Sequence, residues 1–168
     1  MKKLLSLILF IAVPPSALGE TSIGTGLGIP YGTLGVNMSH TVSENVDLTV
    51  GLGTTILAGT AYSVGGRYYL KESDSGFRLT ALYGTNAIIT RREECTFCFL
   101  PDYEAFEGLT FGVGWGHRAS ASGWNIDLML VATSEAFSRA DELRSQGYEG
   151  DFRQGSRIAL SAGYHWAL

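Results

Sequence analysis

Three histidines are the side chains best suited to general-base chemistry, and their positions argue against that role. Cleavage of an acyl ester ordinarily needs an imidazole beside a serine or a similar nucleophile. His117 precedes Ser120 by three residues, but both fall at a predicted short turn, and the two longest predicted loops carry no histidine. His40 and His165 fall near the ends of predicted strands. We therefore expect no catalytic residues, and we place the histidines at a polar interface or inside the fold.

Two cysteines, Cys95 and Cys98, form the only other local motif that suggests chemistry. A Cys-x-x-Cys pair indicates redox or metal chemistry in a reducing compartment, whereas in an exported chain it favours a disulfide. The sequence has no second cysteine pair and no nearby histidine to complete a zinc site. We expect a small disulfide that pins a loop, with no metal ion and no cofactor.

Charged side chains are the third candidate, because five of them fall on one face of five successive predicted strands. A buried charge without a partner is costly, so residues of opposite sign on one inner face are expected to pair. We predict a charge network that plugs the interior, and the alternative is a conduction or binding path. The five residues are Asp47, Arg67, Arg78, Arg118 and Asp127.

The elements that carry these residues are strands, because apolar residues recur at every second position through most of the chain. Large apolar side chains from Ile158 to Leu168 alternate with small or polar ones, which is typical of a strand with two different faces. The same period predicts eight strands, each of about ten residues. They cover residues 22–29, 34–39, 46–53, 62–70, 77–84, 109–116, 124–131 and 157–168.

The connections between these strands alternate in length. The short ones are residues 43–45, 71–76 and 120–123, and the connections between them include the two longest, residues 91–107 and 134–155. This alternation is typical of outer-membrane barrels, which have short turns at one end and long loops at the other. The sequence therefore predicts an all-β fold, an eight-stranded antiparallel up-and-down transmembrane β-barrel.

Composition indicates which face of the barrel is inside. Glycine accounts for 22 of 168 residues, and charged residues make up only 17%, whereas soluble domains average about 7% glycine and 25% charge. An eight-stranded barrel is too narrow to enclose the tryptophans and most of the large aliphatic side chains. We therefore place glycine and the small polar residues inside and the apolar face outside. The alternative is a soluble, lipocalin-like periplasmic binding barrel with the opposite polarity.

The first residues have the features of a secretory signal peptide. Two lysines precede an apolar run over residues 4–13, and Ala17 and Gly19 are the small residues expected before a cleavage site. A membrane-anchoring helix would need about 20 apolar residues, and Pro14 and Pro15 interrupt this run. We predict a signal peptide over residues 1–19 and one barrel domain over residues 20–168.

A band of aromatic residues gives separate support for a membrane orientation. Aromatic girdles mark the interfaces of outer-membrane barrels with water. Five aromatic side chains fall on the outer face at the strand ends that lie next to the short turns. These predicted girdle residues are Tyr68, Phe77, Trp115, Trp124 and Trp166.

The last eight residues resemble the assembly signal of bacterial outer-membrane proteins. In that signal a polar residue, a glycine, an aromatic or apolar residue and a terminal apolar residue stand at fixed spacing. The matching residues are Ser161, Gly163, Trp166 and Leu168, although the commonest form ends in Phe. With the eight-strand plan, the chain is similar to small OmpA/OmpX-type barrels. The resemblance implies the bacterial outer membrane, insertion by its assembly machinery, and both termini in the periplasm.

Barrels of this type host adhesins, structural anchors and lipid enzymes, so the resemblance implies no single activity. We expect a structural or surface-interaction role: envelope integrity, adhesion or lipopolysaccharide contact through outer loops 91–107 and 134–155, with an extracellular protein as a further partner. Capping-box spacing predicts a short helix over residues 138–144 in the second loop. The alternative is a lipid A-modifying acyl hydrolase or transferase on the same barrel. A net charge of −4 argues against a nucleic-acid partner.

Overall fold

The computed structural model describes residues 19–91, 102–145, 152–154 and 156–168, which form nine strands, one α-helix and one short 3-10 turn. The elements in chain order are β1 (Thr21–Gly28), η1 (Ile29–Tyr31), β2 (Thr33–Ser43), β3 (Val46–Thr54), β4 (Thr60–Tyr69), β5 (Ser75–Arg91), β6 (Asp102–His117), β7 (Gly123–Val131), α1 (Glu135–Ser145), β8 (Phe152–Gln154) and β9 (Ile158–Ala167). The signal-peptide prediction lies almost entirely outside the described residues.

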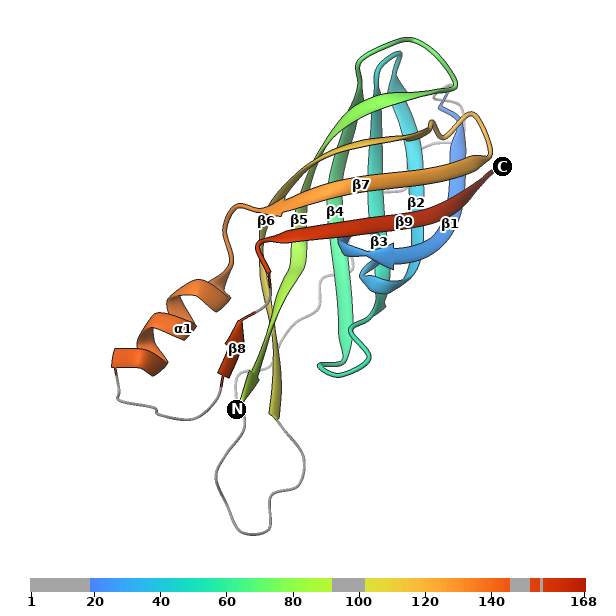
Figure 1. Cartoon of the computed structure of the whole chain (residues 1–168). Helices are drawn as coiled ribbons and strands as arrows, with labels where there is room; N and C mark the ends of the chain where they lie inside the picture. Colours follow the sequence, from blue (N-terminus) through green and yellow to red (C-terminus); the bar gives the residue numbers. More distant parts are fainter. Residues whose placement is uncertain (1–18, 92–101, 146–151, 155) are drawn as a thin grey trace.

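Eight of these strands close into one antiparallel barrel (Figure 1). Neighbouring strands follow the order β4-β3-β2-β1-β9-β7-β6-β5, and β5 pairs with β4 to complete the ring. The backbone N–H of Leu168 donates to the carbonyl of Thr21 at 2.8 Å, so the two ends of the barrel domain lie side by side at the end with the short turns. The all-β, eight-stranded antiparallel barrel predicted from alternation is therefore confirmed.

Two strands are longer than the alternation predicts. β5 continues to Arg91 and β6 begins at Asp102, so the prediction that residues 91–107 form a loop is wrong for residues 102–107. The reason is a β-bulge, because the register shifts where Thr85 pairs with Glu107 and Ala87 pairs with Phe106. A bulge adds one residue to one strand. The extra residue interrupts the two-residue period of apolar side chains. The period therefore no longer identifies the part of the hairpin that lies beyond the bulge.

The helix also begins earlier than predicted. α1 covers Glu135–Ser145, whereas capping-box spacing placed its start at Ser138. The backbone N–H of Ala136 donates to Ser134 Oγ at 3.3 Å, so Ser134 lies at the helix N-terminus and shields one of the free N–H groups there. Among the described residues, no helix is long and apolar enough to cross a membrane.

The barrel is polar inside and apolar outside. Interior side chains at the middle of the strands, such as Asn37, Thr49 and Asp127, are at most 1% exposed. Outward side chains of the same strands remain about half exposed: Val50 by 50%, Leu128 by 51% and Val36 by 53%. This is the reverse of a soluble domain, in which large apolar side chains are buried.

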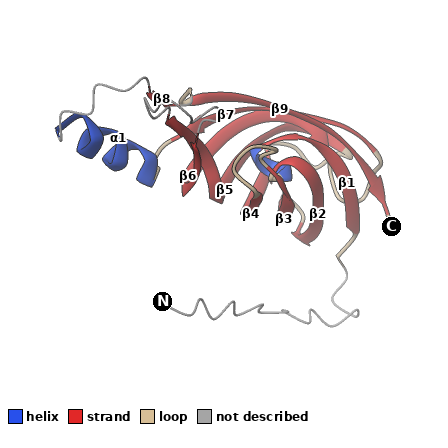
Figure 2. Ribbon diagram, turned by 90° about the horizontal axis from the view of Figure 1, so that it is seen from below, coloured by secondary structure: helices blue, strands red, loops and turns tan. Residues whose placement is uncertain are grey.

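The connection between β1 and β2 folds into the barrel instead of extending outward. Figure 2 shows η1 enclosed by the strands, and its three residues are buried. The carbonyl of Pro30 accepts hydrogen bonds from Asn37 Nδ2 at 2.7 Å and from Ser63 Oγ at 3.2 Å. Gly32, with a φ of 60°, ends the turn in the left-handed conformation that favours glycine. The alternation of apolar residues did not predict this inward fold.

Glycines in the barrel wall make room for this turn, which leads to a prediction. A Cβ atom on Gly51 would overlap the carbonyl oxygen of Pro30 and lie 2.6 Å from Ser63 Oγ. We expect Gly51→Ala to destabilise the barrel by about 1–3 kcal/mol, because backbone cannot move aside cheaply. Gly66 on the adjacent strand is the control, because its nearest atom would be 3.6 Å away.

Gly66→Ala is expected to be neutral or to add about 0.5–1 kcal/mol, because alanine reduces the entropy of the unfolded chain. Urea unfolding of both variants, followed by tryptophan fluorescence, gives the comparison. Equal stability of the two variants would contradict the packing of η1 described above.

Beyond the barrel, the β5–β6 hairpin, α1 and β8 form a structured cap (Figure 1). Ile89 is buried together with Ala136 and Ala140 of α1, with Ala87 and Phe106 packed against them. The bulge residue Asn86 donates from Nδ2 to the carbonyl of Thr133 at 2.8 Å and to Thr110 Oγ1 at 3.2 Å. These contacts connect the cap to the barrel wall.

Candidate functional site

The most buried charges of the described residues form a pair inside the lumen. Arg78 donates from Nε to Asp127 Oδ1 at 3.0 Å and from Nη2 to Oδ2 at 2.8 Å, and both side chains have no exposed surface. The same guanidinium also donates to Asn125 Oδ1 and, at 3.4 Å, to Tyr69 Oη. Gly114 lies between Arg78 and Asp127 in register, and a Cβ there would overlap Asp127 Oδ1. The glycine therefore provides the space for a bidentate ion pair.

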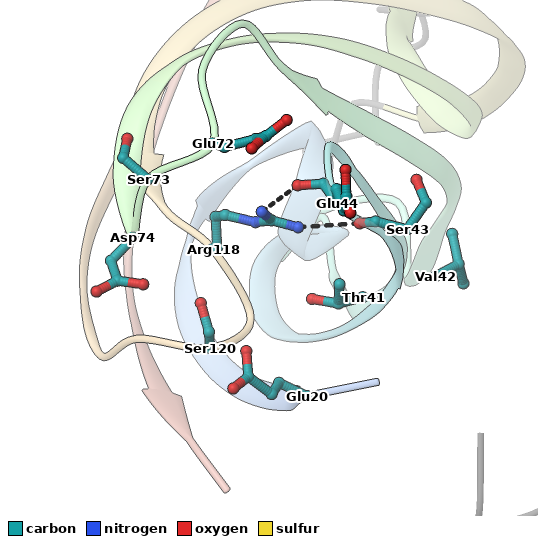
Figure 3. Close-up of a pocket in the computed structure, with 10 residues that line it drawn as sticks. All are labelled: Glu20, Thr41, Val42, Ser43, Glu44, Glu72, Ser73, Asp74, Arg118 and Ser120. Atoms are coloured by element: carbon teal, nitrogen blue, oxygen red, sulfur yellow. Dashed lines mark hydrogen bonds between the residues drawn. The ribbon is translucent and has the colours of Figure 1, made fainter. Parts of the chain in front are cut away.

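A second charge pair lies at the short-turn end of the lumen. Asp47 Oδ1 accepts from Thr41 Oγ1 at 2.9 Å, and its Oδ2 accepts from the backbone N–H of Ala119 at 3.0 Å. Arg118 lies 3.7 Å from Asp47 and also donates to the carbonyl oxygens of Ser43, at 3.0 Å, and Glu44. Figure 3 shows Arg118 reaching across the opening to this backbone. The side chain thereby ties the β6–β7 turn to the β2–β3 turn.

This end of the barrel has a negatively charged rim. A pocket of about 430 Å³ surrounds Arg118. Its lining includes four exposed carboxylates, those of Glu20, Glu44, Glu72 and Asp74 (Figure 3). Arg118 is therefore a single cation within an acidic opening.

The fifth predicted charge, Arg67, is held differently. It is only 1% exposed, and its Nη1 donates to Ser39 Oγ at 3.0 Å. Ser39 in turn belongs to a cluster of hydrogen bonds with Asn37 and Thr49. The structure thus brings four of the five charges together as two pairs and leaves Arg67 on a neutral polar cluster.

The buried histidine His165 connects η1 to the barrel wall. The sequence had indicated no partner for this side chain. His165 Nε2 lies 2.9 Å from Tyr31 Oη, and its Nδ1 lies 3.3 Å from Ser22 Oγ. All three side chains are at most 1% exposed. Gly24 and Gly163 face this group, because a Cβ on either would lie within 3 Å of the histidine or the tyrosine ring. The sequence signal that could have indicated this arrangement is the presence of Gly24 and Gly163 on the same inner face as His165.

The other two histidines, His40 and His117, lie at the short-turn end. His40 Nδ1 contacts Thr21 Oγ1 at 2.9 Å. His117 Nδ1 lies 3.2 Å from the carbonyl of Trp124, and its ring packs edge-on against Trp115 at 5.5 Å. Within the described part of the chain, no hydrogen bond joins either ring to a serine, and Ser120 does not pair with His117.

At the end of the lumen next to the cap, several apolar side chains are buried together. Ile29 of η1, Leu82 and Met129 are buried together, and Phe137 of α1 packs against them. The guanidinium of Arg157 lies 4.4 Å above the Phe137 ring, within cation–π distance. On the outer side of α1, Arg139 donates to Glu142 at 2.6 Å, and this bond raises the pKa of the Arg139 guanidinium. Phe137 is therefore the side chain of α1 that packs against the apolar cluster at this end of the lumen.

The predicted girdle residues all lie on the outer face at the short-turn end. Their exposed fractions range from 41% for Trp115 to 70% for Phe77. Trp124 and Trp166 pack against opposite sides of Tyr164, with ring centroids 5.6 and 5.1 Å apart. These side chains form a band of aromatic rings at the short-turn end of the barrel.

The residues of the predicted assembly signal divide between the two faces of β9. Ser161 is buried in the lumen, and Gly163 lies against the Tyr31 ring. Trp166 and Leu168 point outward, with 49% and 79% of their surface exposed. Cys95 and Cys98 lie outside the described residues, so the disulfide stays a prediction.

No family model, no curated protein and no solved structure matches the chain.

Proposed function

We propose that the protein is an integral barrel of the bacterial outer membrane with a structural or surface-interaction role. The observation that carries the proposal is the inverted polarity, because half-exposed Val, Leu and Phe side chains encircle a polar interior. In water this belt would be an apolar patch far larger than monomeric proteins tolerate. In a bilayer it matches the apolar band of a small outer-membrane barrel. The aromatic rings at the short-turn end supply one interface, and we place both termini on the periplasmic side.

The filled interior supports a structural role over binding or transport through the lumen. A lipocalin-like carrier needs a cavity lined by apolar side chains, whereas this lumen holds η1, the Arg78–Asp127 pair and His165. Arg118 and Phe137 lie at its two ends. The polar contents therefore act as a plug that stiffens the barrel.

The cap supports the surface-interaction part of the proposal. Packing of α1 on the β5–β6 hairpin holds these two elements together, and such a preformed surface lowers the entropy cost of binding a partner. We assign lipopolysaccharide or an extracellular protein as its partner. The hydrolase alternative gains no support from the described residues, because the histidine–serine contact, His165 with Ser22, is sealed inside the lumen.

Quenching of tryptophan fluorescence by brominated lipid tests the membrane placement. Trp115, Trp124 and Trp166 are all outward and near one end, so refolding into vesicles with bromine near the headgroups is expected to quench strongly. Lipids with bromine at the ends of their acyl chains, in the middle of the bilayer, are expected to quench less. A barrel with all three residues replaced by Phe and Met129→Trp is the control, because residue 129 faces the lumen.

Equal emission from the protein in brominated and ordinary vesicles would contradict the proposal. Recovery of the protein from the soluble periplasmic fraction, without the shifted gel migration typical of a heat-resistant barrel, would have the same consequence.

A further inference from the structure

Arg67 is the lumen cation whose charge no described carboxylate balances. Its side chain is 1% exposed, its Nη1 donates to Ser39 Oγ, and the Tyr31 hydroxyl lies close to the guanidinium. Its Nε and Nη2 atoms are buried and have no hydrogen-bond partner among the described residues. A buried, unpaired guanidinium is among the most costly groups a protein can hold.

The two lumen carboxylates are committed elsewhere. Asp127 accepts both of its hydrogen bonds from Arg78. Asp47 is the cross-strand neighbour of Arg67 in register, but its oxygens accept from Thr41 and Ala119 and face Arg118. Arg78 and Arg118 therefore each have an aspartate partner, whereas Arg67 has no ion pair among the described residues.

The free groups of Arg67 have the geometry of an anion site. Nε and Nη2 form one edge of the guanidinium, and in Arg78 the same edge holds the Asp127 carboxylate. Thr80, the register partner of Arg67 on β5, is 3% exposed, and its Oγ1 also has no hydrogen-bond partner in the described chain. The two parallel N–H donors of one guanidinium edge can donate to a single acceptor, and a threonine hydroxyl on the neighbouring strand can supply a further donor.

We propose that Arg67 and Thr80 bind a small monovalent anion, of the size of chloride, inside the lumen. A monatomic anion accepts from several donors at once. It would balance the charge of Arg67. This site depends on the barrel fold and not on the membrane placement, so it stands or falls separately from the proposed function.

Bromide is the probe, because its anomalous scattering identifies it in a crystal. Crystals of the protein grown with sodium bromide are expected to show one anomalous peak next to the Nε–Nη2 edge of Arg67. The measurement uses the unmodified chain, so it does not depend on whether a variant folds. Density at this edge that refines as water, with no anomalous signal, would overturn the proposal.

Refolding in detergent micelles gives the second measurement. At constant ionic strength, with gluconate replaced by bromide, the folding constant of the wild-type protein is expected to rise by up to tenfold for each tenfold increase in bromide. Arg67→Met is expected to abolish this dependence, and Thr80→Val to weaken it.

Arg139→Met is the matched control, because it removes the same charge from the cap, where the side chain is one-third exposed. It is expected to keep the wild-type bromide dependence. An equal response of wild-type protein and Arg67→Met would mean a general salt effect and would contradict the site.

Discussion

Arg78→Met is expected to destabilise the barrel by about 3–5 kcal/mol, the range for breaking a buried ion pair by removing one partner. Asp127 would keep its charge with no exposed surface, and both of its oxygens would lose the donor on which they depend. Urea unfolding of the protein refolded in detergent micelles, followed by tryptophan fluorescence, measures the loss. The same substitution at Arg139 is the control, because that side chain pairs with Glu142 on the exposed cap. There we expect a loss of about 0–1 kcal/mol.

Replacing both partners separates the ion pair from simple packing. Arg78→Met combined with Asp127→Leu leaves no buried charge, so the double variant is expected to recover most of the stability that the single variant loses. A remaining deficit of about 1–3 kcal/mol is expected, because Asn125 Oδ1 loses the donor that Arg78 provides. If Arg78→Met cost no more than Arg139→Met, the charges would be solvated and the lumen would not be sealed.

Val50→Arg is expected to cost about 2–4 kcal/mol when the barrel is refolded into lipid vesicles. Val50 lies at the centre of β3 and points outward, so under the proposed orientation the new charge meets the middle of the bilayer. Val42 at the end of β2 provides a matched control. The two valines are 50% and 51% exposed, and they differ mainly in depth.

Val42→Arg is expected to cost about 0–1 kcal/mol, because a charge near the interface reaches water. A soluble barrel predicts that both substitutions are mild, since both side chains would already be half in water. Urea titrations of the two variants in the same vesicles decide between these outcomes. Equal costs at the two positions would contradict the membrane orientation.

Alternation predicted the strands because each barrel strand has one face toward the lumen and one away from it. Eight segments were placed correctly from apolar residues such as Ile126, Leu128 and Leu130 on β7. The hairpin extension was missed, because the bulge at Asn86 breaks the period. The start of the helix was misplaced, because capping-box spacing indicated Ser138, whereas packing of Ala136 and Ala140 on Ile89 extends the helix back to Ser134.

The sequence predicted which charged residues face the lumen, but not which of them form pairs. Parity placed Asp47, Arg67, Arg78 and Asp127 inside, and all four are at most 1% exposed. Which of them pair depends on the stagger between strands and on the glycines between them, as at Gly114. Neither quantity can be read from one segment, because both arise only when the ring closes.

For the glycines too, the sequence and the tertiary structure determined different properties. From composition and parity the sequence alone determined that small residues line the interior and large apolar residues the exterior, because strand geometry alternates side chains strictly. Only the tertiary structure decided what occupies the space that the glycines leave: the inward turn beside Gly51, the ion pair beside Gly114 and the histidine beside Gly24. These contents come from residues far apart in the chain. Their positions follow from closure of the barrel and not from any local pattern.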